Sequence, residues 1–216
     1  MAKAANLAVE TEAKFTVPDE ETFARLQSVE QIGPYIRRPD KIKKICDRYL
    51  DTAARSFYSR QFAARLRENV KSRELLFTLK RMGPQAQGPI HTRDEYETVV
   101  PGPDIADWPE GEVRRLAEDI AGGQPLRDLV TIDQTRTVSY LYQGARRVAE
   151  MSLDEVTMQT PDGSVRSYEL EVELLPEGNI SDLRIISRVL TEEYGLAPQP
   201  LSKFERALVL SQNYNR

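Results

Sequence analysis

Cysteine and histidine are almost absent from this 216-residue chain, which has one of each, Cys46 and His91. A lone cysteine excludes an internal disulfide framework and makes a cysteine-based zinc site implausible. A single histidine excludes a histidine-rich metal site and disfavours Ser-His-Asp catalysis. Any metal here must be held by oxygen ligands, which favours magnesium, manganese or calcium.

An excess of positive charge and long apolar runs are also lacking. The chain has 30 Lys and Arg against 34 Asp and Glu, a formal net charge of −4. This balance argues against a nucleic-acid binder that relies on a basic surface. No apolar run approaches the ~20 residues of a membrane span, and the first residues lack the apolar segment of a signal peptide. We therefore expect a cytoplasmic protein without nucleic-acid or membrane partners.

Regular alternation of apolar and polar residues is the main pattern that is present. It predicts strands over residues 7–17, 42–52, 62–67, 75–81, 91–100, 130–142, 147–159 and 167–175. Helical patterns cover residues 19–30, 110–121, 180–194 and 201–210, and the turn 161–163 joins the last two strands as a hairpin. Eight strands with a few helices predict one α+β domain whose antiparallel strands close into a barrel.

The polar faces of these strands carry unusually many charges. They comprise Glu10, Glu12 and Lys14, then Arg65 and Arg67, Thr78 and Lys80, Arg93, Glu95 and Glu97, and finally Glu169, Glu171 and Glu173. If helices cover the apolar faces, the charged faces turn inward, where unpaired charges in a dry core would cost several kcal/mol each. A wet tunnel matched to a metal–polyphosphate ligand avoids this cost, because carboxylates bind hard cations and Arg and Lys bind phosphate. A sheet with one solvated face is the alternative, and it is the commoner cause of any single such strand.

The segment VETEAKF, with Glu10, Glu12 and Lys14, resembles the Glu-x-Glu-x-Lys signature of the CYTH superfamily of triphosphate tunnel metalloenzymes. Further segments resemble that family in the same order along nearly the whole chain. These are YLDT (49–52), AARLR, FTLKRMG, HTRDEYE, DQTRT, MSLDEV, YELEVEL and SKFERAL. HTRDEYE and SKFERAL look most like bacterial members in which a helical CHAD domain follows. We expect no CHAD domain within residues 1–216, and a separate CHAD partner is a prediction.

The resemblance implies a single domain over residues 1–216, an eight-stranded antiparallel tunnel with helices outside, with residues 197–216 closing or flanking the tunnel. It implies a role for each charged position. The implied metal ligands are Glu10, Glu12, Glu169 and Glu171, with Glu173 as a further member because the register of three alternating glutamates is ambiguous. The implied phosphate-binding residues are Lys14, Arg65, Arg67, Lys80, Arg93, Arg136 and Lys203; for Arg93 the alternative is an ion pair with Glu95 or Glu97. Glu95, Glu97 and Asp154 would orient the attacking water or the arginines.

The implied activity is hydrolysis of inorganic triphosphate, or another short polyphosphate, with Mg²⁺ or Mn²⁺. Three alternatives stay open: an adenylate cyclase acting on ATP, a thiamine triphosphatase, and a non-catalytic polyphosphate-binding module. The protein is expected to be a monomer or a homodimer. Other residues have structural interpretations: His91 as a surface or loop residue and Trp108 as an anchor for its loop. The basic segment 37–44 is interpreted as a solvated face, and the alternative is that it attracts polyphosphate to the tunnel mouth.

Overall fold

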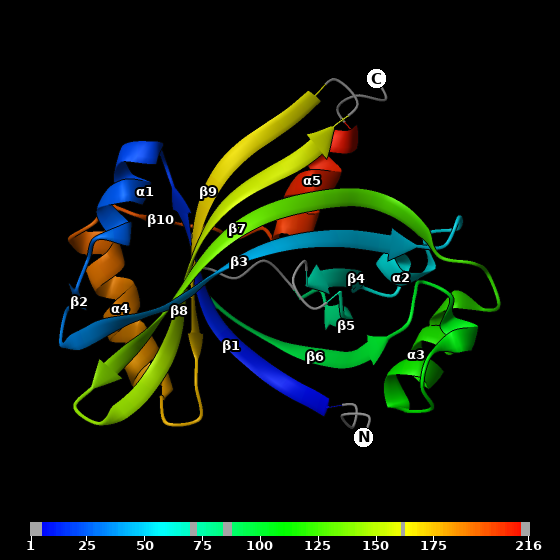
Figure 1. Ribbon diagram of the computed structural model, residues 1–216, viewed down its shortest axis with the longest axis horizontal. Coiled ribbons are helices and arrows are strands. Elements are labelled where there is room, and N and C mark those ends of the chain that lie inside the picture. The colour runs from blue at the N-terminus through cyan, green and yellow to red at the C-terminus, as the bar shows by residue number, and fades with distance from the viewer. Residues whose placement is uncertain (1–5, 70–72, 84–87, 161–162, 213–216) are drawn as a thin grey trace.

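Eight long antiparallel strands close into a barrel in the computed structural model, which describes residues 6–69, 73–83, 88–160 and 163–212 (Figure 1). The order around the barrel is β1-β6-β5-β4-β3-β7-β8-β9, and β9 pairs back with β1. The strands are β1 (Asn6–Val17), β3 (Tyr35–Asp51), β4 (Phe62–Asn69), β5 (Leu75–Arg81), β6 (Ile90–Val100), β7 (Arg127–Gln143), β8 (Arg146–Thr160) and β9 (Gly163–Leu174). Short strands β2 (Gln31–Ile32) and β10 (Ala197–Pro198) pair with β3 and β1. The predicted α+β barrel is confirmed.

Helices pack around this barrel. They are α1 (Glu20–Gln27), α2 (Ser56–Ser59), α3 (Glu112–Ala121), α4 (Ile180–Glu192) and α5 (Lys203–Gln212), with a 3-10 turn η1 (Ile105–Asp107). The four predicted helices are confirmed, whereas α2 and η1 are too short to show a periodic pattern. Pro161 and Asp162 of the predicted hairpin turn lie outside the described residues. None of the described helices is long and apolar enough to cross a bilayer.

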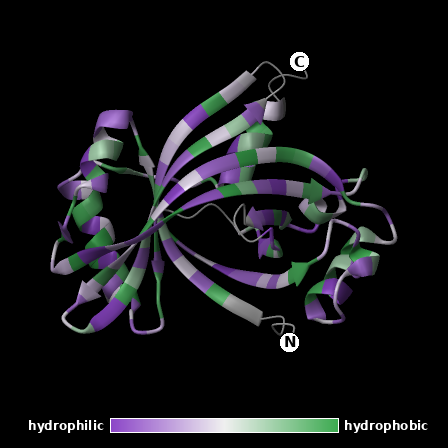
Figure 2. Ribbon diagram, in the orientation of Figure 1, coloured by the Kyte–Doolittle hydropathy of each residue, from purple (hydrophilic) through white to green (hydrophobic). Residues whose placement is uncertain are grey.

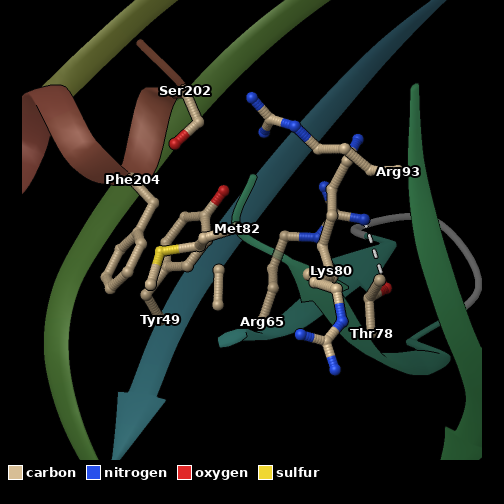
Figure 3. A pocket seen from close by; sticks show the side chains of 10 residues that line it. Tyr49, Arg65, Thr78, Lys80, Met82, Arg93, Ser202 and Phe204 are labelled. Carbon is tan, nitrogen blue, oxygen red and sulfur yellow. Dashed lines mark hydrogen bonds between the residues drawn. The ribbon is translucent and has the colours of Figure 1, made fainter. Parts of the chain in front are cut away.

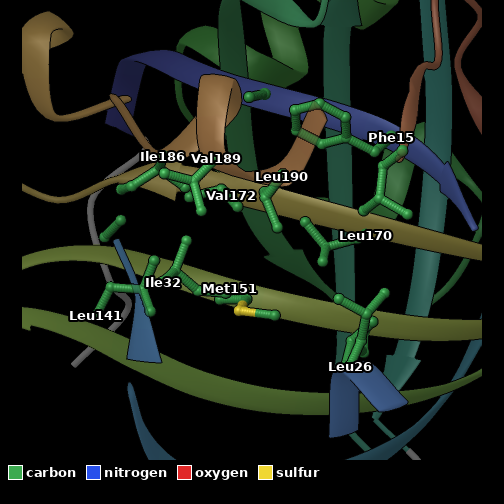
Figure 4. Packing of buried hydrophobic residues seen from close by; sticks show 14 of the residues in the cluster. Phe15, Leu26, Ile32, Leu141, Met151, Leu170, Val172, Ile186, Val189 and Leu190 are labelled. Atoms are coloured by element: carbon green, nitrogen blue, oxygen red, sulfur yellow. The ribbon is translucent and has the colours of Figure 1, made fainter. Parts of the chain in front are cut away.

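The largest apolar core lies between the barrel's outer face and helices α1 and α4 (Figure 4). Ala13 and Phe15 of β1 are fully buried there, while the intervening Lys14 points to the other face. The resulting stripes of hydropathy along the strands are visible in Figure 2. Since side chains alternate between the two faces of a strand, covering one face with helices turns the charged face inward.

A second core fixes α3 and the loop before it against the opposite part of the barrel. Trp108 is buried there, with its ring 4.1 Å from that of Phe77, and its indole N–H donates to the Gly102 carbonyl at 2.8 Å. The prediction that Trp108 anchors its loop is confirmed.

The prediction that the whole basic segment 37–44 is solvated was wrong for Arg37. Strand β3 begins at Tyr35 rather than at Ile42, and this places Arg37 beneath the end of α1. Its guanidinium is buried and donates to the carbonyls of Gln27 (2.6 Å) and Val29 (2.9 Å). The last carbonyls of a helix have no partner within the helix, so a basic side chain that reaches them is held in place.

Candidate active site

The inner faces of the strands enclose a cavity of about 220 Å³ with a strongly charged lining. Most of the residues predicted for the site meet there: Glu10, Glu12, Lys14, Arg65, Arg67, Lys80, Arg93, Glu95, Glu97, Arg136, Glu171, Glu173 and Lys203. Asp47, Tyr49 and Ser202 also line it and were not predicted. Asp154 and Glu169 do not line the cavity, and both are buried beside it.

Strand register explains why these charges tolerate one another. Glu10 of β1 lies directly opposite Arg93 of β6, and Lys80 of β5 lies directly opposite Glu95. Directly opposed residues of an antiparallel pair place their side chains on the same face, where opposite charges attract. The cavity wall therefore alternates acidic and basic groups around the barrel.

Neighbouring strands β4, β5 and β6 contribute Arg65, Lys80 and Arg93 to the basic wall (Figure 3). Arg65 donates to Thr78 Oγ1 at 3.2 Å and lies 3.5 Å from Glu95. Its Nε is buried and has no hydrogen-bond partner in the described part of the chain. A buried donor without a partner is costly, and an anionic oxygen in the cavity would satisfy it. Figure 3 shows Arg65, Lys80 and Arg93 on one side and the apolar group Tyr49, Met82 and Phe204 on the other.

Arg67 is held in place by a carboxylate that the sequence analysis missed. Asp47 accepts both of its guanidinium hydrogen bonds, at 2.6 and 2.8 Å, and also accepts from Gln134 Nε2 at 2.6 Å. Burial alone would raise the pKa of Asp47, but the guanidinium of Arg67 outweighs it and holds that pKa near 2. The signal was weak, because Asp47 stands between the apolar Ile45 and Tyr49 in the same phase of its predicted strand.

Acidic groups crowd together on the wall formed by β1 and β9. Glu10 forms an ion pair with Lys80, and Glu12 lies 3.6 Å from the same ammonium. Burial, followed by the charges of Glu10, Glu150 and Glu12, raises the pKa of Glu173 to about 8. Oxygen donors that repel one another in this way suit a divalent cation, which would relieve the repulsion. Among the described residues, no three acidic, cysteine or histidine side chains already converge on one metal position.

At the α5 end of the cavity, the charges satisfy one another. The ammonium of Lys203 lies 2.7 Å from Glu169, 2.7 Å from Glu171 and 2.9 Å from Asp154. Asp154 also accepts two hydrogen bonds from Arg136, at 2.7 and 2.6 Å. Burial raises the pKa of Glu169, whereas Lys203 and Arg136 overcome the effect of burial on Glu171 and lower its pKa. These groups form a closed ion-pair network, completed by an ion pair between Arg206 and Glu169.

His91 was wrongly predicted to be a surface or loop residue. It is only 4% exposed and lies in β6 in phase with Arg93 and Glu95, on the inner face. Burial, followed by the charges of Lys14 and Arg93, lowers its pKa to about 4. The ring is therefore neutral at pH 7, and its Nδ1 lies 3.2 Å from Arg93 Nη2. Read in phase with Arg93, Glu95 and Glu97, the sequence already carried the signal for this position.

Comparisons with known proteins agree with this architecture. A putative adenylyl cyclase from Hippeastrum with a dominant triphosphatase activity superposes with a TM-score of 0.72 at 19% identity, covering 94% of this chain and 96% of that one. A putative adenylate cyclase from Bacillus halodurans gives a TM-score of 0.64 at 21% identity, covering 94% and 98%. No curated protein matches the chain by sequence. The model of the CYTH domain matches residues 8–208, so the chain belongs to the CYTH domain family.

Proposed function

We propose that this protein is a metal-dependent triphosphatase that hydrolyses inorganic triphosphate to pyrophosphate and phosphate. The observation that carries the proposal is the lining of one cavity, which brings seven basic side chains together with the carboxylates of Glu10, Glu12, Glu171 and Glu173. A pure anion-binding module has no need of the carboxylates. Transfer of a phosphoryl group needs mainly positioning and neutralisation of negative charge, and both sets of groups supply these.

The phosphate oxygens are assigned to the basic groups that line the cavity: Lys14, Arg65, Arg67, Lys80, Arg93 and Arg136. The partnerless Nε of Arg65 supports this assignment most directly. Lys203 was also predicted to bind phosphate, but three carboxylates surround its ammonium. We assign Lys203 to positioning Glu171 and Asp154, because an ammonium has only three N–H donors.

A divalent metal would be held by Glu10, Glu12, Glu171 and Glu173. Glu173 takes the place that the sequence analysis gave to Glu169, whose two oxygens accept from Lys203 and Arg206. When bound, Mg²⁺ or Mn²⁺ would neutralise phosphate charge and acidify a bound water. The chain's own arginines would stabilise the transferring phosphoryl group as water attacks and pyrophosphate leaves.

Three carboxylates are assigned to orienting other groups. Glu95 and Glu97 lie 3.5 and 3.8 Å from the guanidinium of Arg65, where they orient that side chain and the attacking water. Asp154 is fully buried and orients Arg136 by a two-point hydrogen bond. The cytoplasmic location, a separate CHAD partner and the monomeric or dimeric state stay predictions.

The test is phosphate release from inorganic triphosphate with Mg²⁺, with Mn²⁺ and with a chelator, beside ATP reactions assayed for cyclic AMP. We expect metal-dependent release from triphosphate and little turnover of ATP. Glu10→Gln should lower the rate by about 100-fold or more while the circular dichroism spectrum is kept, because removing one element of charge stabilisation costs that much. Glu192→Gln, at an exposed position on α4, is the matched control.

The outcomes separate the alternatives. Tight triphosphate binding without turnover would identify the protein as a binding module rather than an enzyme. Formation of cyclic AMP from ATP would identify it as an adenylate cyclase. Wild-type turnover in a folded Glu10→Gln variant would remove Glu10 from the metal site.

A further inference from the structure

A second group of cations continues from the cavity along β3, β7 and β8, away from α5. Tyr49 of β3 stacks on Phe204 of α5, with ring centroids 4.7 Å apart. Lys43 precedes Tyr49 by six residues, so it lies about 20 Å farther along the strand. Lys43 is directly opposite Arg136 in the β3–β7 register. Directly opposed side chains share a face, so Lys43 lies on the same face of the sheet as the cavity lining.

Lys43 is a half-buried cation whose ammonium forms no ion pair or side-chain hydrogen bond with any described residue. Its cross-strand neighbour Arg136 is also a cation, and like charges directly opposite each other are unfavourable. Burial lowers the pKa of Lys43, Glu150 partly opposes this, and Arg136, Lys41 and Arg67 add to the lowering. Arg136 and Arg67 have carboxylate partners, whereas no described carboxylate pairs with Lys43. An anion beside Lys43 would relieve this imbalance.

Beyond Lys43, two tyrosines on the same face are covered by arginines. The guanidinium carbon of Arg38 lies 4.3 Å from the ring centre of Tyr142, and that of Arg147 lies 4.8 Å from the ring centre of Tyr140. Arginines seated on the rings occupy faces that a planar organic group would need for stacking. Their N–H donors remain suited to phosphate oxygens. The surface therefore favours an anionic chain over a nucleobase.

We propose that Lys43, with Arg38, Lys41 and Arg147 beyond it, forms an anion-binding extension of the cavity. It would bind the additional phosphates of a linear polyphosphate that is longer than triphosphate and reaches out of the barrel. This proposal rests on the proposed triphosphatase function for the occupant of the cavity itself. Three described carboxylates lie near the extension: Asp40, which pairs with Lys41 at 3.0 Å, and Glu150 with Glu173 directly opposite it. The four cations of the extension still outnumber them.

The test is Lys43→Met beside Lys44→Met as the matched control. Lys44 is the next residue along β3, is exposed, and lies on the opposite face of the strand. Equilibrium binding of inorganic triphosphate and of a linear polyphosphate of about ten units would be measured by calorimetry in chelator-containing buffer. Lys43→Met should lower the ratio of polyphosphate affinity to triphosphate affinity about tenfold, the effect of losing one charge-assisted hydrogen bond. Lys44→Met should leave that ratio unchanged.

Arg147→Gln is a second variant, at an exposed position, and it should lower the same ratio by about threefold. An equal loss of both affinities in Lys43→Met would place Lys43 in the triphosphate site and overturn the extension. An unchanged ratio of polyphosphate to triphosphate affinity in both variants would also overturn the extension. A wild-type protein that binds triphosphate more tightly than the longer polyphosphate would overturn it as well. Selective binding of the longer polyphosphate without any hydrolysis would instead contradict the triphosphatase function and support the anion-binding extension.

Discussion

The two ends of the charged interior differ in how their charges are balanced. At the α5 end, Lys203 contacts three carboxylates. Each of these carboxylates also contacts an arginine, either Arg136 or Arg206. Away from α5, Lys43 lies opposite Arg136 of that network but has no carboxylate partner among the described residues, and Glu173 lies among other glutamates. Charges that satisfy one another hold the structure together, whereas charges left unbalanced cost stability and are useful only when a ligand arrives. The comparison therefore separates positioning groups from binding groups.

The largest effect is expected from Lys203→Met. Removing this ammonium would leave Asp154, Glu169 and Glu171 buried with less compensation, which costs about 3–5 kcal/mol of unfolding free energy. Lys43→Met removes an unpartnered cation from beside Arg136, so its unfolding free energy should stay within about 0.5 kcal/mol of wild type. Urea unfolding of both variants checks this difference. Equal losses in the two variants would show that the ends do not differ.

The sequence revealed most of the barrel because the central parts of β1 and β9 alternate. Every second residue is charged in 9–15 and in 168–174, so Glu10, Glu12 and the three late glutamates stand out. The charged residues on the inner face of β3 do not stand out in this way. Ile45 separates Lys43 from Asp47, and Tyr49 follows Asp47 on the same face. A mixed face of this kind has no clear period, so Asp47 was missed as a residue that lines the cavity. The pairing of Glu169 with Lys203 and Arg206 depends on where α5 docks, and no local pattern reports that.

A smaller effect is expected from Asp47→Asn, which probes a positioning carboxylate inside the binding region. Arg67 would lose its charged partner, which should cost about 2 kcal/mol of unfolding free energy at pH 7 and raise the KM for triphosphate. The folded-state pKa of Asp47 is about 2, below the ordinary 3.8. Its stabilising contribution is therefore complete above pH 3.8 and is lost as the pH falls through 2.

Unfolding measured at pH 7 and near pH 2 checks this linkage. The gap between wild type and Asp47→Asn should be largest at pH 7 and should narrow in acid. A gap that is the same at both values would show that the Asp47–Arg67 charge pair does not carry the effect.

The smallest effect concerns the pKa of His91, which lies beside the cations Lys14 and Arg93. His91 is the only histidine, so its ring protons give a single titrating signal in the NMR spectrum. Its pKa should be about 4, because burial and the cations Lys14 and Arg93 disfavour the charged ring. Between pH 6.5 and 4 the unfolded chain binds this proton more readily, so the free energy of unfolding falls as the pH falls. Triphosphate bound beside Lys14 and Arg93 would add negative charge and raise the pKa of His91. An ordinary pKa near 6.5 in the free protein would contradict the burial of His91 among cations.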